Sequence, residues 1–303
     1  MACIAVWADA SALTAHATTE GDEMPRSAMS LEVLRTERIG PHMIRVIAGG
    51  PGLAEFPGTD HTDRYVKLLF SPPGVEYPEP FDVEEIRREL PRDQWPRTRT
   101  YTVRALDHTT GELTIDFVHH GDTGIAGPWA AAARPGDVLR LLGPGGAYAP
   151  NPAAGWHLFV GDDAALPAIG AAAERLPRGV PALAVLQVDT ADDHQDLPTE
   201  ADLRVTWLHR ADLPAGGDPG EAAAAQLLDA VAALAFPVGD VHAFVHGEAA
   251  AVKGLRRHLL DERRVPRDAL SVSGYWRRGR DEEGFRVYKQ EERAAEEAAA
   301  QGR

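Results

Sequence analysis

The chain has 303 residues, which is enough for two domains of average size. Its formal net charge of −15 argues against nucleic acid as the main partner, because binding phosphates requires a cationic face. A single cysteine, Cys3, excludes an internal disulfide, a four-thiolate iron–sulfur cluster and a cysteine-rich zinc site. No run approaches the roughly 18 apolar residues of a membrane span, and the N-terminus lacks the basic region of a signal peptide, so we expect a cytoplasmic protein.

Residues 1–28 are predicted to form a weakly ordered leader, and residues 29–150 carry a pattern typical of short β-strands. Runs rich in β-branched and aromatic residues are separated by turn residues, at 30–39, 42–50, 63–70, 100–106, 112–120 and 138–143. Segment 82–90 has the spacing of a helix. Short strands at this spacing predict an antiparallel β-barrel.

Near residue 150 the pattern changes to strands that alternate with helices. Predicted strands lie at 156–162, 181–189, 203–210, 241–247 and 269–276, and predicted helices at 164–176, 221–235 and 248–262. This alternation predicts a doubly wound parallel sheet, with a ligand cleft at the carboxyl ends of its strands. We therefore divide the chain into the leader, a barrel domain (29–150), an α/β domain (151–286) and a polar tail (287–303).

Residues 97–104 combine basic and aromatic side chains on a predicted strand. Alternation places Arg99, Tyr101 and Val103 on one face of that strand and Thr102 on the other. An aromatic ring can stack on a flavin while an arginine binds pyrophosphate oxygens, so the strand is a candidate flavin site. The alternative is an ordinary strand with a solvated basic face.

The next motif leads from a strand through a glycine-containing turn into a short helix, over residues 117–130. Backbone amides in such a turn form a candidate phosphate site, although an ordinary connecting loop has the same pattern. His119 and His120 would point to opposite faces of a strand, so we expect no metal site there. The glycine-rich run 143–146 is followed by residues that cannot open a helix, and we interpret it as a turn between the domains.

Three further transitions fall at the ends of strands in the α/β half. Gly161-Asp162 and Gly247-Glu248 each lead from a strand into a helix, which suits a nucleotide cleft. Trp276 precedes Arg277 and Arg278. Its ring would either cover a planar cofactor or fill the interface between the domains.

Taken in this order, the motifs resemble the siderophore-interacting protein family, FAD-dependent ferric-siderophore reductases of the ferredoxin-NADP reductase superfamily. The resemblance rests on segments 63–68, 99–104, 117–130, 135–137, 143–146, 161–169, 247–252 and 274–279. It covers roughly residues 29–285 and implies an FAD-binding barrel followed by an NAD(P)H-binding α/β domain. Many members have Ala-Ser at Ala126-Gly127, so a phosphate contact there would come from the backbone.

The resemblance also implies roles for individual residues. Arg99 would bind the FAD pyrophosphate, Tyr101 would stack on the isoalloxazine, and Thr102 would bind near flavin N5, with Tyr101 and Thr102 as the catalytic pair. FAD would further contact Val103, His119, His120, Gly121, Ala126, Gly127 and Trp129. The nicotinamide nucleotide would contact Gly161, Asp162, Ala165, Leu166 and Pro167, and the strand-end patterns add Asp189, Gly247, Glu248 and Trp276 as candidate contacts. Lys67 and Arg277 match basic positions that the family uses near the ferric substrate, and the charge of the neighbouring Arg278 suits the same site.

Redox chemistry supports this assignment independently. A nicotinamide gives two electrons as hydride and ferric iron accepts one, so a flavin is needed between them. Oxygen chelators bind Fe³⁺ more tightly than Fe²⁺, so reduction releases the iron. Many ferric siderophores are anionic, which suits a basic substrate site.

Asp189 at the end of a strand favours NADH over NADPH, whereas Arg204 and Arg210 argue the other way. We expect a monomer that acts on a ferric siderophore and binds neither nucleic acid nor membrane. A general flavin or quinone NAD(P)H oxidoreductase and a non-catalytic siderophore binder are the alternatives.

Overall fold

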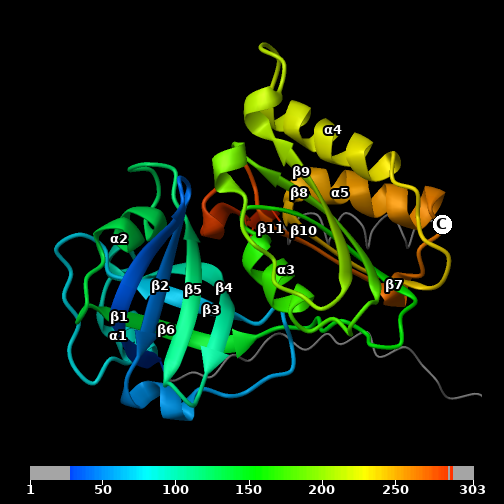
Figure 1. The fold of residues 1–303 in the computed structure, drawn as a ribbon. Coiled ribbons are helices and arrows are strands. Elements are labelled where there is room, and N and C mark those ends of the chain that lie inside the picture. The colour runs from blue at the N-terminus through cyan, green and yellow to red at the C-terminus, as the bar shows by residue number, and fades with distance from the viewer. Residues whose placement is uncertain (1–27, 286, 289–303) are drawn as a thin grey trace, which may run out of the picture.

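The computed structural model describes residues 28–285, 287 and 288, which form a closed barrel followed by a parallel sheet (Figure 1). The predicted tail, apart from residues 287 and 288, and the predicted leader, apart from residue 28, lie outside this range. No helix in the described part of the chain is long and apolar enough to cross a membrane.

The barrel is antiparallel, as predicted, with strand order β1-β2-β5-β4-β3-β6. Its strands are β1 (Met29–Gly40), β2 (Met43–Gly49), β3 (Tyr65–Phe70), β4 (Arg97–Asp107), β5 (Glu112–Val118) and β6 (Val138–Gly145). Alternate side chains point inward and bury a continuous apolar core that includes Val66, Leu68 and Ile115. Helix α1 (Val83–Glu89) confirms the helix predicted in this half, and helix α2 (Ala126–Ala132) follows β5.

The second half is a five-stranded parallel sheet in the order β11-β10-β7-β8-β9, which confirms the predicted α/β fold. The strands are β7 (Trp156–Asp162), β8 (Pro181–Val188), β9 (Asp202–His209), β10 (Val241–Glu248) and β11 (Leu270–Trp276). Every residue of the central strand β7 is buried, as expected for a parallel strand covered on both faces.

Helices cover both faces of this sheet (Figure 1). Helix α3 (Leu166–Ala173) packs on one face, and helices α4 (Pro219–Ala232) and α5 (Ala249–Arg257) pack together on the other. Helix α3 also contacts β4 of the barrel. There a Cβ on Gly170 would lie 3.1 Å from Arg104 Nε, so a glycine allows the two domains to approach closely.

Two local predictions are wrong. Gly143–Gly145 belong to strand β6 rather than to a turn, because the barrel continues to this point and Gly145 pairs with Tyr65. His119 and His120 do not lie on a strand, because β5 ends at Val118 and the chain leaves the sheet toward Gly121, whose φ is 65°.

Candidate functional site

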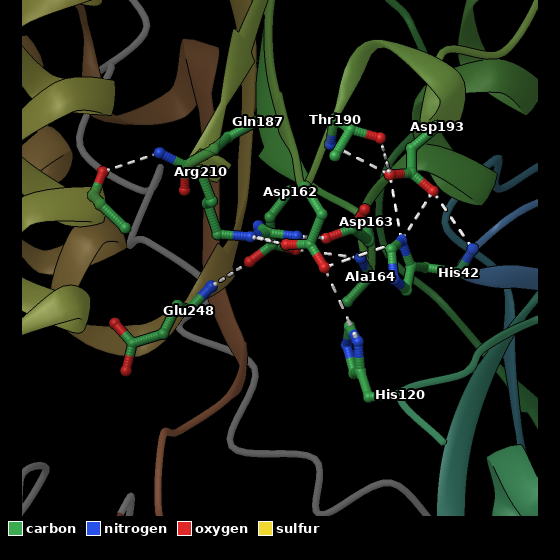
Figure 2. A network of polar contacts seen from close by, with 12 residues as sticks. His42, His120, Asp162, Asp163, Ala164, Gln187, Thr190, Asp193, Arg210 and Glu248 are labelled. Atoms are coloured by element: carbon green, nitrogen blue, oxygen red, sulfur yellow. Dashed lines mark hydrogen bonds and ion pairs between the residues drawn. The ribbon is translucent and has the colours of Figure 1, made fainter. Parts of the chain in front are cut away.

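The carboxyl ends of β7, β8 and β10 and the segment after β9 converge at the edge of the sheet that meets the barrel (Figure 2). Asp162, the last residue of β7, is buried there. Its Oδ2 accepts hydrogen bonds from Glu248 N and Trp276 Nε1, each at 2.8 Å, and its Oδ1 accepts one from Ala164 N at 3.0 Å. A single carboxylate therefore joins three strand ends.

Asp162 leaves no room for a side chain at position 247, which is occupied by Gly247. That residue has a φ of 146°, and a Cβ on it would lie 2.7 Å from Asp162 Oδ2. Burial, and after it the negative charge of Asp163, raise the pKa of Asp162 to about 6. The hydrogen bonds from Trp276 and Glu248 oppose this shift. The carboxylate thus changes charge near the pH range in which enzymes work.

Beside Asp162 a guanidinium lies between two carboxylates. Arg210 Nε donates to Asp189 Oδ1 at 2.5 Å, and Arg210 Nη2 donates to Asp163 Oδ2. Burial raises the pKa of Asp163 while Arg210 opposes the shift. From the sequence, Asp189 and Arg210 are opposing indications of nucleotide choice, and in the structure they form one ion pair. Arg204 lies earlier on β9, away from the strand end.

The predicted flavin strand, β4, lies on the other side of the interface. Tyr101 packs on Phe117 with ring centroids 4.5 Å apart, and Val103 is buried in the barrel core. Burial raises the pKa of Tyr101, so its phenol stays neutral at working pH. Thr102 is buried, and its side chain opposes the rise that burial causes in the pKa of Tyr275 on β11, so the predicted flavin strand lies near the parallel sheet.

The loop between β5 and α2 carries the other residues that the resemblance assigns to FAD. His119 N donates to His42 O at 2.9 Å, which fixes the start of the loop. Gly121 and Gly124 have φ values of 65° and 86°, and a Cβ on either would meet nothing within 4 Å. Trp129 packs on Phe117. An open loop of left-handed glycines beside packed aromatic rings fits a ligand with a phosphate and a planar ring.

The three residues predicted to bind substrate are spread over two elements. Lys67 pairs in register with Thr100 on the barrel. Arg277 Nη1 lies 3.2 Å from Glu248 Oε1, and Arg278 N donates to the same oxygen at 3.4 Å. The two arginines therefore follow the carboxyl end of β11, whereas Lys67 lies on β3, beside the predicted flavin strand β4.

Several residues of the site were not singled out from the sequence. Glu282 accepts hydrogen bonds from Thr100 N at 2.7 Å and Thr100 Oγ1 at 2.6 Å, and Glu283 lies 3.5 Å from Arg99 Nη1. His42 and Asp193 form a contact between the domains. The sequence around Glu282 and Glu283 does not indicate which residues they contact. The only local signal at His42 is the preceding Gly-Pro turn. Among the described residues, no group of three or more His, Cys, Asp and Glu could hold a metal ion.

Comparison with known proteins identifies the family. The sequence model of a siderophore-interacting FAD-binding domain matches residues 32–148, and that of a siderophore-interacting protein matches residues 154–279. The chain is 33% identical to ferric vibriobactin reductase ViuB of Vibrio cholerae, over 84% of this chain and 91% of that protein. It is 31% identical to the NADPH-dependent ferric-chelate reductase of Escherichia coli, over 81% and 91% of the respective chains.

A solved structure agrees with these matches. The siderophore utilization protein from T. fusca has a TM-score of 0.71 and 37% sequence identity, covering 86% of this chain and 96% of that one. Sequence and fold therefore lead to one conclusion: this chain belongs to the siderophore-interacting protein family.

Proposed function

We propose that this protein is an FAD-dependent NAD(P)H:ferric-siderophore oxidoreductase. The observation that carries the proposal is the contact between β4 and the α/β domain, where Arg104 packs on Gly170 of helix α3 and its Nη2 donates to Glu174 Oε1. It sets a candidate flavin strand beside a candidate nucleotide cleft, as direct hydride transfer requires. The relatives named as a ferric vibriobactin reductase and a ferric-chelate reductase support the choice of substrate.

The barrel would hold FAD through β4 and the loop after β5. Tyr101 would stack on the ring system, Arg99 would bind pyrophosphate, and Thr102 would hydrogen-bond beside the reacting nitrogen. His119, His120, Gly121, Ala126, Gly127, Trp129 and Val103 would complete the FAD site. FAD supplies the exchange between two-electron and one-electron transfer that ferric iron needs.

The α/β domain would bind the nicotinamide nucleotide at its strand ends. Asp162 holds the β7, β10 and β11 ends together through Glu248 N and Trp276 Nε1. Gly161, Ala165, Leu166, Pro167 and Gly247 would line the bound nucleotide. Lys67, Arg277 and Arg278 would attract an anionic ferric chelate, and Arg277 would have to share its charge with Glu248.

We infer that NADH is the preferred donor. Arg210 is the cation that a ribose 2′-phosphate would need, but Asp163 and Asp189 already bind it. Two carboxylates and one guanidinium leave a local net charge of −1 by formal counting, which disfavours a phosphate dianion and suits a ribose hydroxyl. We further place the protein in the cytoplasm, where NAD(P)H is supplied, as a monomer.

The test of the proposed function begins with the purified protein, which should take up FAD and turn yellow. Anaerobic NADH should bleach the flavin, and a ferric siderophore should then restore its colour while a ferrous-iron indicator records Fe²⁺. A protein that takes up no FAD contradicts the proposal. If quinones or free flavin restore the colour far faster than any ferric siderophore, the general oxidoreductase is the correct function. Flavin that NADH and NADPH both fail to bleach indicates a non-catalytic binder.

A further inference from the structure

A histidine of the barrel contacts an acidic loop of the α/β domain. His42 lies in the turn between β1 and β2, and its Nδ1 is 3.0 Å from Asp193 Oδ1 and 3.1 Å from Asp193 Oδ2. The backbone N–H of His42 donates to the same Oδ1 at 3.1 Å. The side chain of Asp193 is 4% exposed and that of His42 is 33% exposed, so this contact between the domains, drawn in Figure 2, is shielded mainly on the Asp193 side.

Asp193 is firmly held on its own side of the interface. Its Oδ2 accepts hydrogen bonds from Thr190 N and Thr190 Oγ1, each at 3.0 Å. Burial alone would raise the pKa of Asp193, but the hydrogen bonds from His42 and Thr190 bring it below its ordinary value. The group therefore stays an anion, fixed in position before the barrel reaches it.

His42 is equally tied to the loop that we assign to FAD. Its carbonyl oxygen accepts the hydrogen bond from His119 N at 2.9 Å, and its ring centroid lies 5.9 Å from that of His120. One residue thus connects the proposed FAD loop to the segment 189–193, which follows β8 in the proposed nucleotide site.

Two carboxylates of the α/β domain lie close to the His42 ring. From the α/β domain, Asp193 faces it directly and Asp189 Oδ2 lies 3.7 Å from His42 Nδ1. Asp189 is also 4.0 Å from His120 Nδ1 and is bound by Arg210, which in turn binds Asp163. Within the same turn, Arg38 Nη1 donates to Pro41 O.

We propose that His42 and Asp193 form a latch that positions the nucleotide domain on the flavin barrel, so that His42 is a positioning residue for the first electron-transfer step. Its role in electron transfer rests on the proposed function, whereas the contact itself does not.

The first experiment measures the contact in the protein without added nucleotide. Hydrogen exchange gives protection factors for the amides of His42 and Thr190, both of which donate to Asp193. In His42→Ala we expect both protection factors to fall about tenfold. His108→Ala, which removes an exposed histidine of the β4–β5 hairpin, is the matched control and should leave them unchanged. If the protection factors in His42→Ala equal those of the wild type, the latch is refuted.

The second experiment separates the two half-reactions by anaerobic stopped flow. We expect His42→Ala to lower the rate of flavin reduction at saturating NADH about tenfold, because a small misplacement of the domains is costly. Reoxidation by a ferric siderophore and FAD content should not change. His42→Gln, which can still donate to Asp193, should restore most of the rate.

Equal losses in both half-reactions, or an unchanged rate of flavin reduction, contradict the positioning role. A protein that neither nucleotide reduces refutes the proposed function instead. In that case the protection factors still decide whether the latch exists.

Discussion

At the scale of single residues, Asp162 decides the geometry of the proposed nucleotide site. Its carboxylate accepts hydrogen bonds from Ala164 N, Glu248 N and Trp276 Nε1. Since all three partners are donors, a protonated Asp162 would lose part of this network. The pKa of about 6 lies above the ordinary 3.8, so this group contributes to stability at low pH and loses that contribution as the pH rises toward 6. Site geometry and stability therefore respond to pH in opposite directions.

Asp162→Asn tests this account. The variant mimics the protonated form, because its amide NH₂ cannot accept a hydrogen bond. We expect the KM for NADH to rise about tenfold, since hydrogen bonds to a charged group are lost. In the wild type the KM should rise as the pH falls below about 6, and in the variant it should be independent of pH in this range. A wild-type KM that is flat across pH 5–7 would refute the assignment.

The Asp189–Arg210 pair carries the prediction on nucleotide choice. Asp189→Asn removes one of the two carboxylates that bind Arg210, so the guanidinium becomes available to a 2′-phosphate. We expect the ratio of kcat/KM for NADPH to that for NADH to rise about tenfold. Asp212→Asn is the matched control, because Asp212 lies in the same segment but pairs with His209. A ratio that moves equally in both variants, or in neither, speaks against the pair as the determinant.

Some of these site residues could be identified from the sequence because they lie at predicted strand ends. Asp162 and Asp189 follow apolar runs, so their place at the carboxyl edge of the sheet was predictable. The residues that join the two domains were not predictable, because Asp193 contacts His42 and Glu282 contacts Thr100, each more than a hundred positions away. Such contacts depend on how the two domains meet, which no local pattern encodes.

At the scale of the secondary-structure element, the central strand β7 contains an unusual histidine. His157 is completely buried, and neither of its ring nitrogens has a hydrogen-bond partner. Burial, followed by the nearby His242, lowers the pKa of His157 from 6.5 to about 4. As the pH falls from 6.5 toward 4, the unfolded chain gains a proton at this position that the folded chain does not. Stability is therefore lost over that interval, by at most about 3 kcal/mol.

His157→Leu removes this charge-dependent loss and the two unpaired nitrogens together. We expect the free energy of unfolding at pH 7 to rise by about 1–3 kcal/mol, and the gain over wild type to be larger at pH 4.5. Urea denaturation at both pH values provides the measurement. A variant with the same pH dependence as the wild type would show that His157 is solvated or paired.

Most elements were predictable because their periodicity is strong. The apolar run of β7 and the alternation along β5 are clear signals, and both strands form where expected. Gly143–Gly145 was wrongly predicted to form a turn, because glycine and proline are typical of turns. Closure of the barrel outweighs that preference, since Gly145 pairs with Tyr65 of β3.

At the scale of the whole molecule, the two halves have separate apolar cores and a polar interface. The barrel core contains residues only up to Leu141, whereas the two cores of the α/β domain begin with Tyr148 and Trp156. Ion pairs join the halves, among them Arg104 with Glu174 and Arg175 with Asp60. Polar interfaces of this kind are typical of domains that fold independently.

A fragment of residues 28–150 tests that independence. We expect it to fold cooperatively and to bind FAD at least as well as the full chain, because Glu282 and Glu283 no longer contact Thr100 and Arg99. Dithionite should reduce its flavin, and a ferric siderophore should reoxidise it, but NADH should leave it oxidised because the nucleotide sheet is missing. Flavin spectra with each reductant, set beside those of the full chain, provide the measurement. Reduction of the fragment by NADH would contradict the assignment of nucleotide binding to the α/β domain, and a fragment that fails to fold would show that the polar interface stabilises the barrel.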